Sequence, residues 1–250
     1  MFTLPIYDDN PAGRPSFVNW LVIAACVLVF VWQLSLSERG EVAAVFAYGL
    51  VPAVLTGAGE LPPELRLMPA PLTVVTSMFL HGGWMHLIGN MLYLWIFGNN
   101  VEDSMGHVRF VVFYLLCGIV AALAQTLADP SSEIPMVGAS GAIAGVLGAY
   151  LLLHPRANVG VLLVIIIYVR IISVPAIIVL GLWFVMQLYS GAHTPTDQGG
   201  VAYMAHIGGF IAGMVLIPFF KRPWVPLFAG PNSRPFAVVR SSGHLPPPIR

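Results

Sequence analysis

The chain has 250 residues, of which 58% are hydrophobic and only 9% are charged. Soluble domains average about 25% charged residues, so 11 acidic and 11 basic side chains are too few to cover a soluble body of this size. The net charge is zero and no basic stripe is present, which disfavours nucleic acid as a partner. The composition therefore predicts an integral membrane protein.

Apolar stretches of about 20 residues, the length that crosses a bilayer, recur along the chain. They predict an all-α membrane protein with six spans, at about 17–36, 80–101, 108–127, 137–155, 173–189 and 200–220. The first two spans are separated by a long first external loop of about 40 residues, rich in charge, Gly and Pro. Residues 159–169 are apolar but are followed by Arg170 and Pro175, so we expect a membrane-surface segment there. Two short hairpinned helices over 159–189 are the alternative.

The basic residues are distributed unequally between the two sides of these spans. Nine of the 11 Lys and Arg residues fall on the side that holds both termini, and only Arg39 and Arg66 fall on the other. The positive-inside rule then places both termini in the cytoplasm, which suits a bacterial inner (plasma) membrane. We expect a cytoplasmic N-terminal segment at 1–16, a six-span domain at 17–220 and a flexible Pro-rich cytoplasmic tail at 221–250.

Polar residues inside a span are costly, so the few present in this chain indicate a functional site. Span two carries His81, His86 and Asn90, span four carries Ser140, and span six carries His206. All three spans start at the external side, and these residues come early in each of them. The five side chains are therefore predicted to lie at a similar depth in the outer leaflet.

Ser140 lies in the sequence Gly138-Ala139-Ser140-Gly141, at the predicted start of span four. The glycines Gly138 and Gly141 permit a tight turn and close approach of a second backbone. A helix N-terminus offers free backbone N–H groups and a positive dipole end, which together could hold an oxyanion. The alternative is that Ser140 only caps the helix.

His206 is followed by Gly209 and Gly213, which form a face of small residues in span six. Close packing of that face on the Gly- and Ala-rich span four would bring His206 towards Ser140. The alternative role for His206 is an ordinary interhelical hydrogen bond.

His86 and Asn90 are four residues apart and share a helix face, where they could complete an oxyanion hole or simply hold helices together. His81 lies off that face. Zinc is disfavoured because no His-Glu-x-x-His motif and no intraspan carboxylate accompanies these histidines. Cys26 and Cys117 lie in apolar runs and are expected to be buried thiols rather than a disulfide or a metal pair.

These motifs resemble those of the rhomboid family of intramembrane serine proteases. The resemblance rests on three sequences: Gly138-Ala139-Ser140-Gly141, Ala205-His206-Ile207-Gly208-Gly209, and His81-Gly82-Gly83-Trp84-Met85-His86-Leu87-Ile88-Gly89-Asn90. Gly98-Asn99-Asn100-Val101-Glu102-Asp103 is similar too. Ala144 stands where some members have an aromatic residue beneath the histidine, and Trp183, Phe184 or Tyr203 could replace it.

The resemblance implies a six-span rhomboid-like bundle that cleaves transmembrane protein substrates in the lipid bilayer with no cofactor and no metal. Ser140 would be the nucleophile and His206 the base, while His86, Asn90 and the Ser140 backbone N–H would form the oxyanion hole. Gly138, Gly141, His81 and Gly209 would shape the site. Two other functions remain open from the sequence: a non-catalytic membrane binder or chaperone, and a small transporter or channel.

Overall fold

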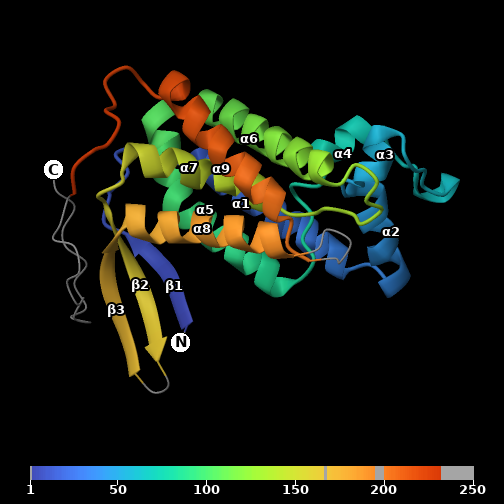
Figure 1. The fold of residues 1–250 in the computed structure, drawn as a ribbon, viewed down its shortest axis with the longest axis horizontal. Coiled ribbons are helices and arrows are strands. Elements are labelled where there is room, and N and C mark those ends of the chain that lie inside the picture. The colour runs from blue at the N-terminus through green and yellow to red at the C-terminus, as the bar shows by residue number, and fades with distance from the viewer. Residues whose placement is uncertain (1, 166–167, 195–199, 232–250) are drawn as a thin grey trace.

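A computed structural model describes residues 2–165, 168–194 and 200–231 of the chain. Most of these residues are helical, and the long helices run side by side in one bundle (Figure 1). Four helices are long and apolar enough to cross a membrane: α1 (Phe17–Leu34), α6 (His107–Ala128), α8 (Ala176–His193) and α9 (Tyr203–Phe220). The described part of the chain is therefore that of a mainly helical integral membrane protein.

Two further helices occupy the remaining predicted spans, α5 (Trp84–Met105) and α7 (Ser140–Leu153). The 22-residue α5 is less apolar than the four helices above, because it carries His86, Asn90, two further asparagines and two acids. α7 is apolar but has only 14 residues, and Gly141–Tyr150 are all buried by its neighbours. The predicted ranges agree with these six helices to within a few residues, and the number of spans stays a prediction.

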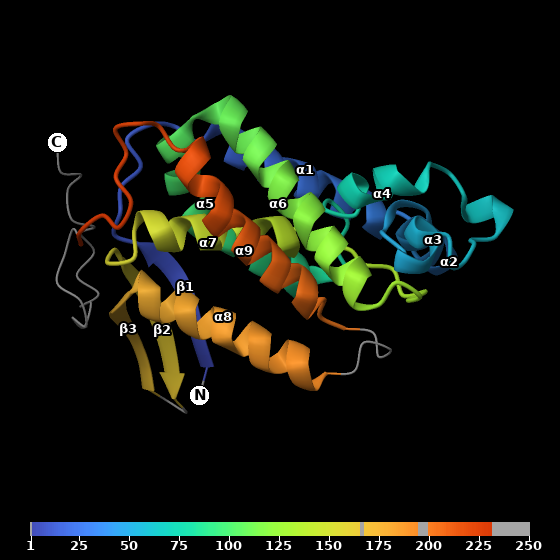
Figure 2. The same cartoon turned by 45° about the horizontal axis from the view of Figure 1, so that its top comes forward.

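The segment between α1 and α5 is partly helical. It contains α2 (Glu38–Tyr48), α3 (Pro52–Thr56), the 3-10 turn η1 (Pro63–Leu65) and α4 (Ala70–Thr76). These short elements lie together at one end of the bundle, opposite the sheet described below (Figures 1 and 2).

The prediction of an all-α fold is wrong for three segments, which form strands: β1 (Phe2–Asp8), β2 (Asn158–Ile165) and β3 (Tyr168–Pro175). They pair as an antiparallel sheet in the order β1-β2-β3. Of the predicted membrane-surface segment 159–169, residues 159–165 belong to β2 and residues 168–169 begin β3. Val and Ile dominate β2 and β3, and such β-branched residues favour strands. The sheet leaves the bundle sideways at the end where α8 begins (Figure 2).

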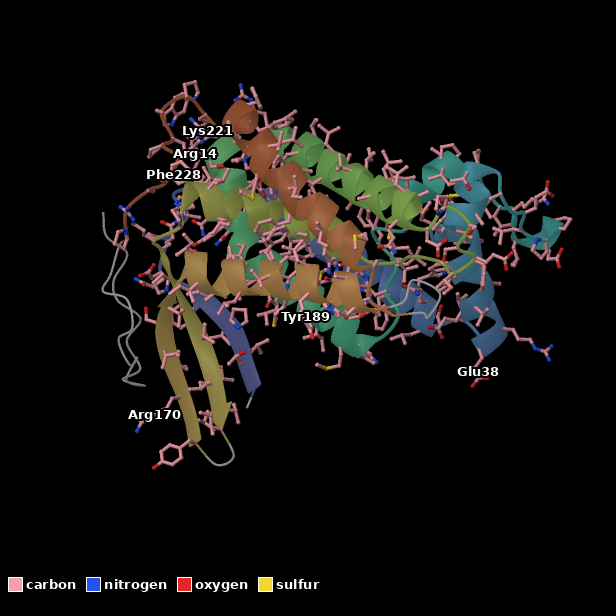
Figure 3. The ribbon with its side chains drawn as sticks, viewed as in Figure 1. Arg14, Glu38, Arg170, Tyr189, Lys221 and Phe228 are labelled. Carbon is pink, nitrogen blue, oxygen red and sulfur yellow. The ribbon has the colours of Figure 1, made fainter. Side chains whose placement is uncertain are left out.

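The first and last described stretches of the chain lie at the same end of the bundle as the sheet (Figure 1). Figure 3 shows Arg14, Lys221 and Phe228 close together there, with Glu38 at the opposite end. Of the predicted tail, residues 221–231 are described, and they are attached to the bundle. The backbone N–H of Arg222 donates to the carbonyl of Ser104, and that of Phe228 to the carbonyl of Leu152. Residues 232–250 lie outside the described part of the chain.

Close backbone contact between α7 and α9 fixes the geometry at the centre of the bundle. A Cβ atom at Gly209 would overlap the carbonyl oxygen of Gly141, and one at Gly213 would overlap that of Gly145. Only glycine fits at these two positions of α9, as the Gly-x-x-x-Gly pattern predicts. The approach brings the first turns of α7 and α9 together, where Ser140 and His206 lie.

Candidate active site

Ser140 and His206 are in direct contact although they are 66 positions apart in the chain. The Ser140 Oγ lies 2.8 Å from His206 Nε2. Ser140 is the first residue of α7 and Ala139 is the N-cap, so the alternative of a capping serine is wrong. His206 lies in the first turn of α9, which begins at Tyr203, so it comes early in its span as predicted.

The second ring nitrogen of His206 contacts a residue that the sequence analysis did not identify. His206 Nδ1 lies 2.7 Å from Oε1 of Gln187, a buried residue of α8. An amide oxygen is only an acceptor, so this contact places the hydrogen of a neutral imidazole on Nδ1. His206 Nε2 is then free to accept the proton of the Ser140 hydroxyl.

Trp183, one turn before Gln187 on α8, packs against the His206 ring with 5.7 Å between ring centroids. Trp183 was one of the three candidates to pack against His206 in place of an aromatic residue at position 144. Phe184 instead stacks on Phe210 of α9, at 4.4 Å between centroids. α8 therefore contributes two side chains, Trp183 and Gln187, to the surroundings of His206.

His86 and Asn90 both lie on α5 and face the same cavity as Ser140. The Gly82 N–H donates to His86 Nδ1 at 3.4 Å, which leaves Nε2 as the hydrogen-bearing nitrogen of a neutral ring. The buried Asn90 Nδ2 finds no acceptor among the described residues. These two groups are donors available to a bound molecule.

Gly138 separates the His86 ring from the start of α7. Its φ of 122° is a conformation that side chains with a Cβ rarely adopt, and a Cβ there would lie 2.6 Å from His86 Cε1 and Nε2. The backbone N–H of Gly138 donates to the carbonyl of Ser77, which fixes the turn. Gly138 thus lets the Ser140 turn approach the imidazole of His86.

His81 is placed differently from the prediction, because α5 begins at Trp84 and His81 precedes it. Its ring packs edge-on against His86, with 5.2 Å between centroids. Gln33 of α1 holds the His81 backbone at both polar atoms, at 3.0 and 3.1 Å. His81 therefore supports the position of His86.

These side chains surround a cavity of about 710 Å³ between α5, α6, α7, α8 and α9. Ser140, His206, His86, Asn90 and Trp183 all line it. Within the described residues no three His, Cys, Asp or Glu side chains gather in a way that could hold a metal ion. Cys26 and Cys117 are both buried free thiols, as predicted.

Fold and site together define a helical membrane protein with a serine–histidine pair facing an internal cavity. The family model described as the rhomboid domain matches residues 70–223, which include every residue of this pair and of the cavity donors. The chain belongs to the rhomboid family.

Several curated relatives match over much of this chain. It is 34% identical over 143 residues to RHOMBOID-like protein 5 of Arabidopsis thaliana, which covers 57% of this chain and 42% of the relative. It is 32% identical over 204 residues to Rhomboid protease GluP of Bacillus subtilis, covering 80% of this chain and 34% of the relative. Rhomboid protein 1, mitochondrial, of Saccharomyces cerevisiae is 31% identical over 58% of this chain and 40% of its own length. The chain thus spans less than half of the length of each of these three relatives.

Proposed function

We propose that the protein is an intramembrane serine endopeptidase that hydrolyses peptide bonds in or near the transmembrane segments of other proteins. The observation that carries this proposal is the 2.8 Å contact between Ser140 Oγ and His206 Nε2 at the wall of a cavity. A serine hydroxyl is a weak nucleophile until a base takes its proton. Membership of a family whose named members include proteases supports the same conclusion.

In this mechanism Ser140 Oγ attacks the carbonyl carbon of a substrate peptide bond while its proton passes to His206 Nε2. The electron pair of the carbonyl bond moves to the oxygen, which becomes an oxyanion. When the tetrahedral intermediate collapses, the C–N bond breaks and His206 gives its proton to the leaving amine. Water then attacks the acyl-enzyme, with His206 again as the base, and Ser140 is regenerated.

Three donors are available for the oxyanion: the Asn90 amide, the His86 Nε2–H and the backbone N–H of Ser140. As the first residue of α7, Ser140 has a backbone N–H that no intrahelical carbonyl accepts. A buried amide without a partner costs about 1–3 kcal/mol. An oxyanion beside Asn90 would accept a hydrogen bond from this amide and remove that cost. The amide would then have a partner in the transition state that it lacks in the free protein, and such a difference lowers the barrier.

The substrate must present an extended peptide bond, because a helical carbonyl is already hydrogen-bonded and shielded. Substrate segments with Gly or other helix-weakening residues should therefore be cleaved best. Water for the second step would be held by the polar lining of the cavity. No cofactor is needed for either step.

For the membrane arrangement we propose that α1, α5, α6, α7, α8 and α9 all cross the bilayer. Arg14 and Lys221 lie at the end where the sheet begins, which would be the cytoplasmic side and would hold both termini (Figure 3). Residues 17–220 would form the catalytic domain, with 1–16 and 221–250 on the cytoplasmic side of the membrane. We place the protein in the inner (plasma) membrane of a bacterium, and one of the relatives above comes from a bacterium, Bacillus subtilis.

The test is cleavage of a single-span substrate by purified protein in vesicles. Wild type should cleave, while Ser140→Ala and His206→Ala should each lower kcat by a factor of about 10⁴ or more. Ser104→Ala and His193→Ala are matched controls, since Ser104 donates to the Val101 carbonyl and His193 lies at the end of α8, and neither residue lines the cavity. Cleavage by Ser140→Ala would exclude the assigned nucleophile. Binding of substrate by wild type without any cleavage would favour the membrane binder or chaperone.

A further inference from the structure

The imidazole of His206 is held between two helices by both of its ring nitrogens. Nε2 faces Ser140 Oγ on α7 at 2.8 Å, and Nδ1 faces Gln187 Oε1 on α8 at 2.7 Å. The Gln187 side chain is only 8% exposed, so water competes little for its amide oxygen. His206 therefore has a fixed partner on the side away from the serine.

We propose that Gln187 is a positioning residue for His206, holding the imidazole in the tautomer that can deprotonate Ser140. This inference rests on the proposed protease function. With its hydrogen on Nδ1 donated to Gln187, the ring keeps the lone pair of Nε2 for the serine proton. With the hydrogen on Nε2, the ring could only donate to Ser140 and could not act as its base.

Gln187 also acts on the charged form of the ring. When Nε2 takes the serine proton, the imidazole becomes a cation, and the Nδ1–H bond to the amide oxygen becomes charge-assisted. A carboxylate in this position would stabilise the cation more strongly. A buried carboxylate inside a membrane-spanning helix is, however, much costlier than a neutral amide. Glutamine supplies the acceptor without the charge.

Because Gln187 lies on α8, the tautomer and orientation of the His206 imidazole depend on the position of this helix. Only Ala176, Leu180 and Gln187 are buried along this helix, so it is held to the bundle by a small area. Trp183 and Gln187 are four residues apart and contact the same imidazole from one face of α8. A displacement of α8 would remove both the acceptor and the aromatic support of His206.

The experiment compares wild type with Gln187→Met and Gln187→Glu, using the same single-span substrate and a full pH profile of kcat. Gln187→Met keeps the length of the side chain and removes the acceptor, so kcat should fall about 10- to 100-fold with KM nearly unchanged. Gln187→Glu keeps the acceptor and adds a charge, so the acid limb of its profile should move by about one unit to higher pH. Tyr189→Phe, on the exposed face of α8, is the matched control (Figure 3).

Several results would overturn the proposal. One is a Gln187→Met protein with the kcat and pH profile of wild type; another is a Gln187→Glu profile that does not move. If Gln187→Met fails to fold, the Gln187→Glu profile still decides the question, because a purely structural role would not shift it. Failure of the protease function is separate: there, Ser140→Ala would behave like wild type or wild type would not cleave.

A second, independent observation concerns the three-stranded sheet, which is apolar on both faces. Residues opposite one another in the ladder share a face, so Val161 and Ile172 point to one side and Leu162 and Ile171 to the other. Val161 belongs to the core of the bundle and Ile172 packs against that core. Leu162 and Ile171, on the other face, remain partly exposed.

The described part of the hairpin tip is exposed and apolar too. Ile165, Tyr168 and Val169 are 42%, 67% and 61% exposed, and Arg170 points away from the bundle (Figure 3). Asp8 and Arg170 are the charged residues of the described strands. An exposed sheet of this kind would aggregate in water unless something covers it.

We infer that the sheet rests in the boundary between headgroups and acyl chains of the bilayer, beside α8. Its exposed apolar side chains continue the exposed apolar surface of α8, which includes Ile177, Leu182 and Val185. Both views show the sheet extending sideways from the bundle rather than along it (Figures 1 and 2). Tyr168 and Arg170 at the tip are residue types that anchor at membrane interfaces.

The test uses an environment-sensitive fluorophore on Val169→Cys in vesicles, with Ser131→Cys in the polar α6–α7 loop as the control. The native Cys26 and Cys117 are buried and should not react. Nitroxide lipids labelled near the headgroup should quench the probe at 169 at least twofold more than the probe at 131, and aqueous iodide should do the reverse. Quenching of the probe at 169 by iodide alone would overturn the inference. Protection from both quenchers would do so as well, because a second copy of the chain would then cover the sheet.

Discussion

Two polar clusters occupy opposite ends of the same two helices, and they differ in how their hydrogen-bonding groups are satisfied. The cavity cluster contains Ser140, His206, Gln187, His86 and Asn90. The junction cluster contains Asp8, Asn100, Glu102 and Tyr150. α5 and α7 each contribute to both clusters at positions ten residues apart, which is about 15 Å along a helix.

The junction cluster joins the N-terminal strand and α1 to the ends of α5 and α7. Asp8 accepts hydrogen bonds from the Tyr150 hydroxyl at 2.5 Å and from the Asn100 amide at 2.8 Å. Glu102, which is 1% exposed, accepts from the backbone N–H groups of Val18 and Asn19 at 3.1 and 2.7 Å. Its carboxylate thus caps α1, where the N-cap Ser16 makes no side-chain hydrogen bond.

The cavity cluster has, by contrast, donors that face a cavity, such as the Asn90 amide. The two clusters therefore differ in the role that their polar groups can play. Carboxylates whose oxygens are filled by backbone and side-chain donors hold the fold together. Donors left open at a cavity wall can serve a bound substrate. The predictions below test this distinction.

The largest contrast is expected between two asparagines of α5. Asn90→Ala should lower kcat by about 10²–10³, the loss typical of one oxyanion donor, while thermal stability stays within about 1 kcal/mol of wild type. Asn100→Ala should lower stability by about 1–3 kcal/mol, because it leaves Asp8 with one donor fewer, and kcat of the folded protein should be unchanged. Thermal unfolding and substrate cleavage should be measured on both variants. A loss of stability in Asn90→Ala together with a loss of kcat in Asn100→Ala would refute the distinction between the two clusters.

The next effect concerns the contact between Gly138 and His86. Gly138→Ala should lower kcat about 10- to 100-fold, because the new Cβ would displace the His86 ring and strain the turn before Ser140. Gly57→Ala is the control, since Gly57 also has a positive φ but has open space where the Cβ would be. It should destabilise the protein by about 1 kcal/mol without changing kcat. Equal losses of kcat in the two variants would contradict the assigned role of Gly138.

A stability effect without a catalytic effect is expected at Glu102. Glu102→Gln replaces one acceptor oxygen by a donor that would face an N–H group at the start of α1. The free energy of unfolding should fall by about 1–3 kcal/mol, which denaturation in detergent would measure. Glu60→Gln, at an exposed ion pair with Arg66, should change stability by less than about 1 kcal/mol. If Glu102→Gln kept its stability and lost much of its kcat, the claim that the junction cluster only stabilises the fold would be contradicted.

The smallest effect is a dependence of stability on pH. Burial, helped by the nearby charge of Asp9, raises the pKa of Asp8 to about 7, against the lowering effect of the Tyr150 hydrogen bond. Between about pH 4 and pH 7 the folded protein keeps a proton that the unfolded chain has released, so stability should fall as pH rises through this window and level off above it.

Asp8→Asn keeps an oxygen that accepts both hydrogen bonds and removes the titration. Between pH 4.5 and pH 8 the melting temperature of wild type should fall relative to that of Asp8→Asn. The difference should be about 2–4 °C for each kcal/mol of stability that the ionisation of Asp8 removes. Asp129→Asn, in the loop after α6, is the control, and its melting temperature should depend on pH as that of wild type does. A wild-type curve that is flat across pH 4–7 would contradict the raised pKa.

The sequence predicted the positions of the helices well because hydropathy over 20 residues is a strong signal. Ser140 and His206 followed from their motifs and their expected depth, and the glycines of α9 explained how the two would meet. The sheet was missed because β2 is apolar on both faces, so it lacks the alternation of a half-buried strand. Its partner β1 lies more than 150 positions earlier in the chain, beyond the reach of any local pattern.

Gln187 was missed for a different reason. A neutral glutamine in an apolar stretch belongs to none of the motifs that carry the resemblance, although any polar residue in a predicted span is a candidate for a buried contact. Only the packing of α8 on α9 reveals that this amide faces His206. The junction cluster was likewise invisible from the sequence, because Asp8 and Tyr150 are 142 positions apart.

Covalent labelling by a fluorophosphonate probe tests the central claim most directly, because it reports an activated serine without requiring the natural substrate. Wild-type protein in vesicles should be labelled, and peptide mapping should place the adduct on Ser140. His206→Ala should abolish the labelling although Ser140 is retained, while the His193→Ala control should be labelled as fast as wild type. An adduct on another serine, or labelling that is independent of His206, would contradict a Ser140–His206 hydrolytic site.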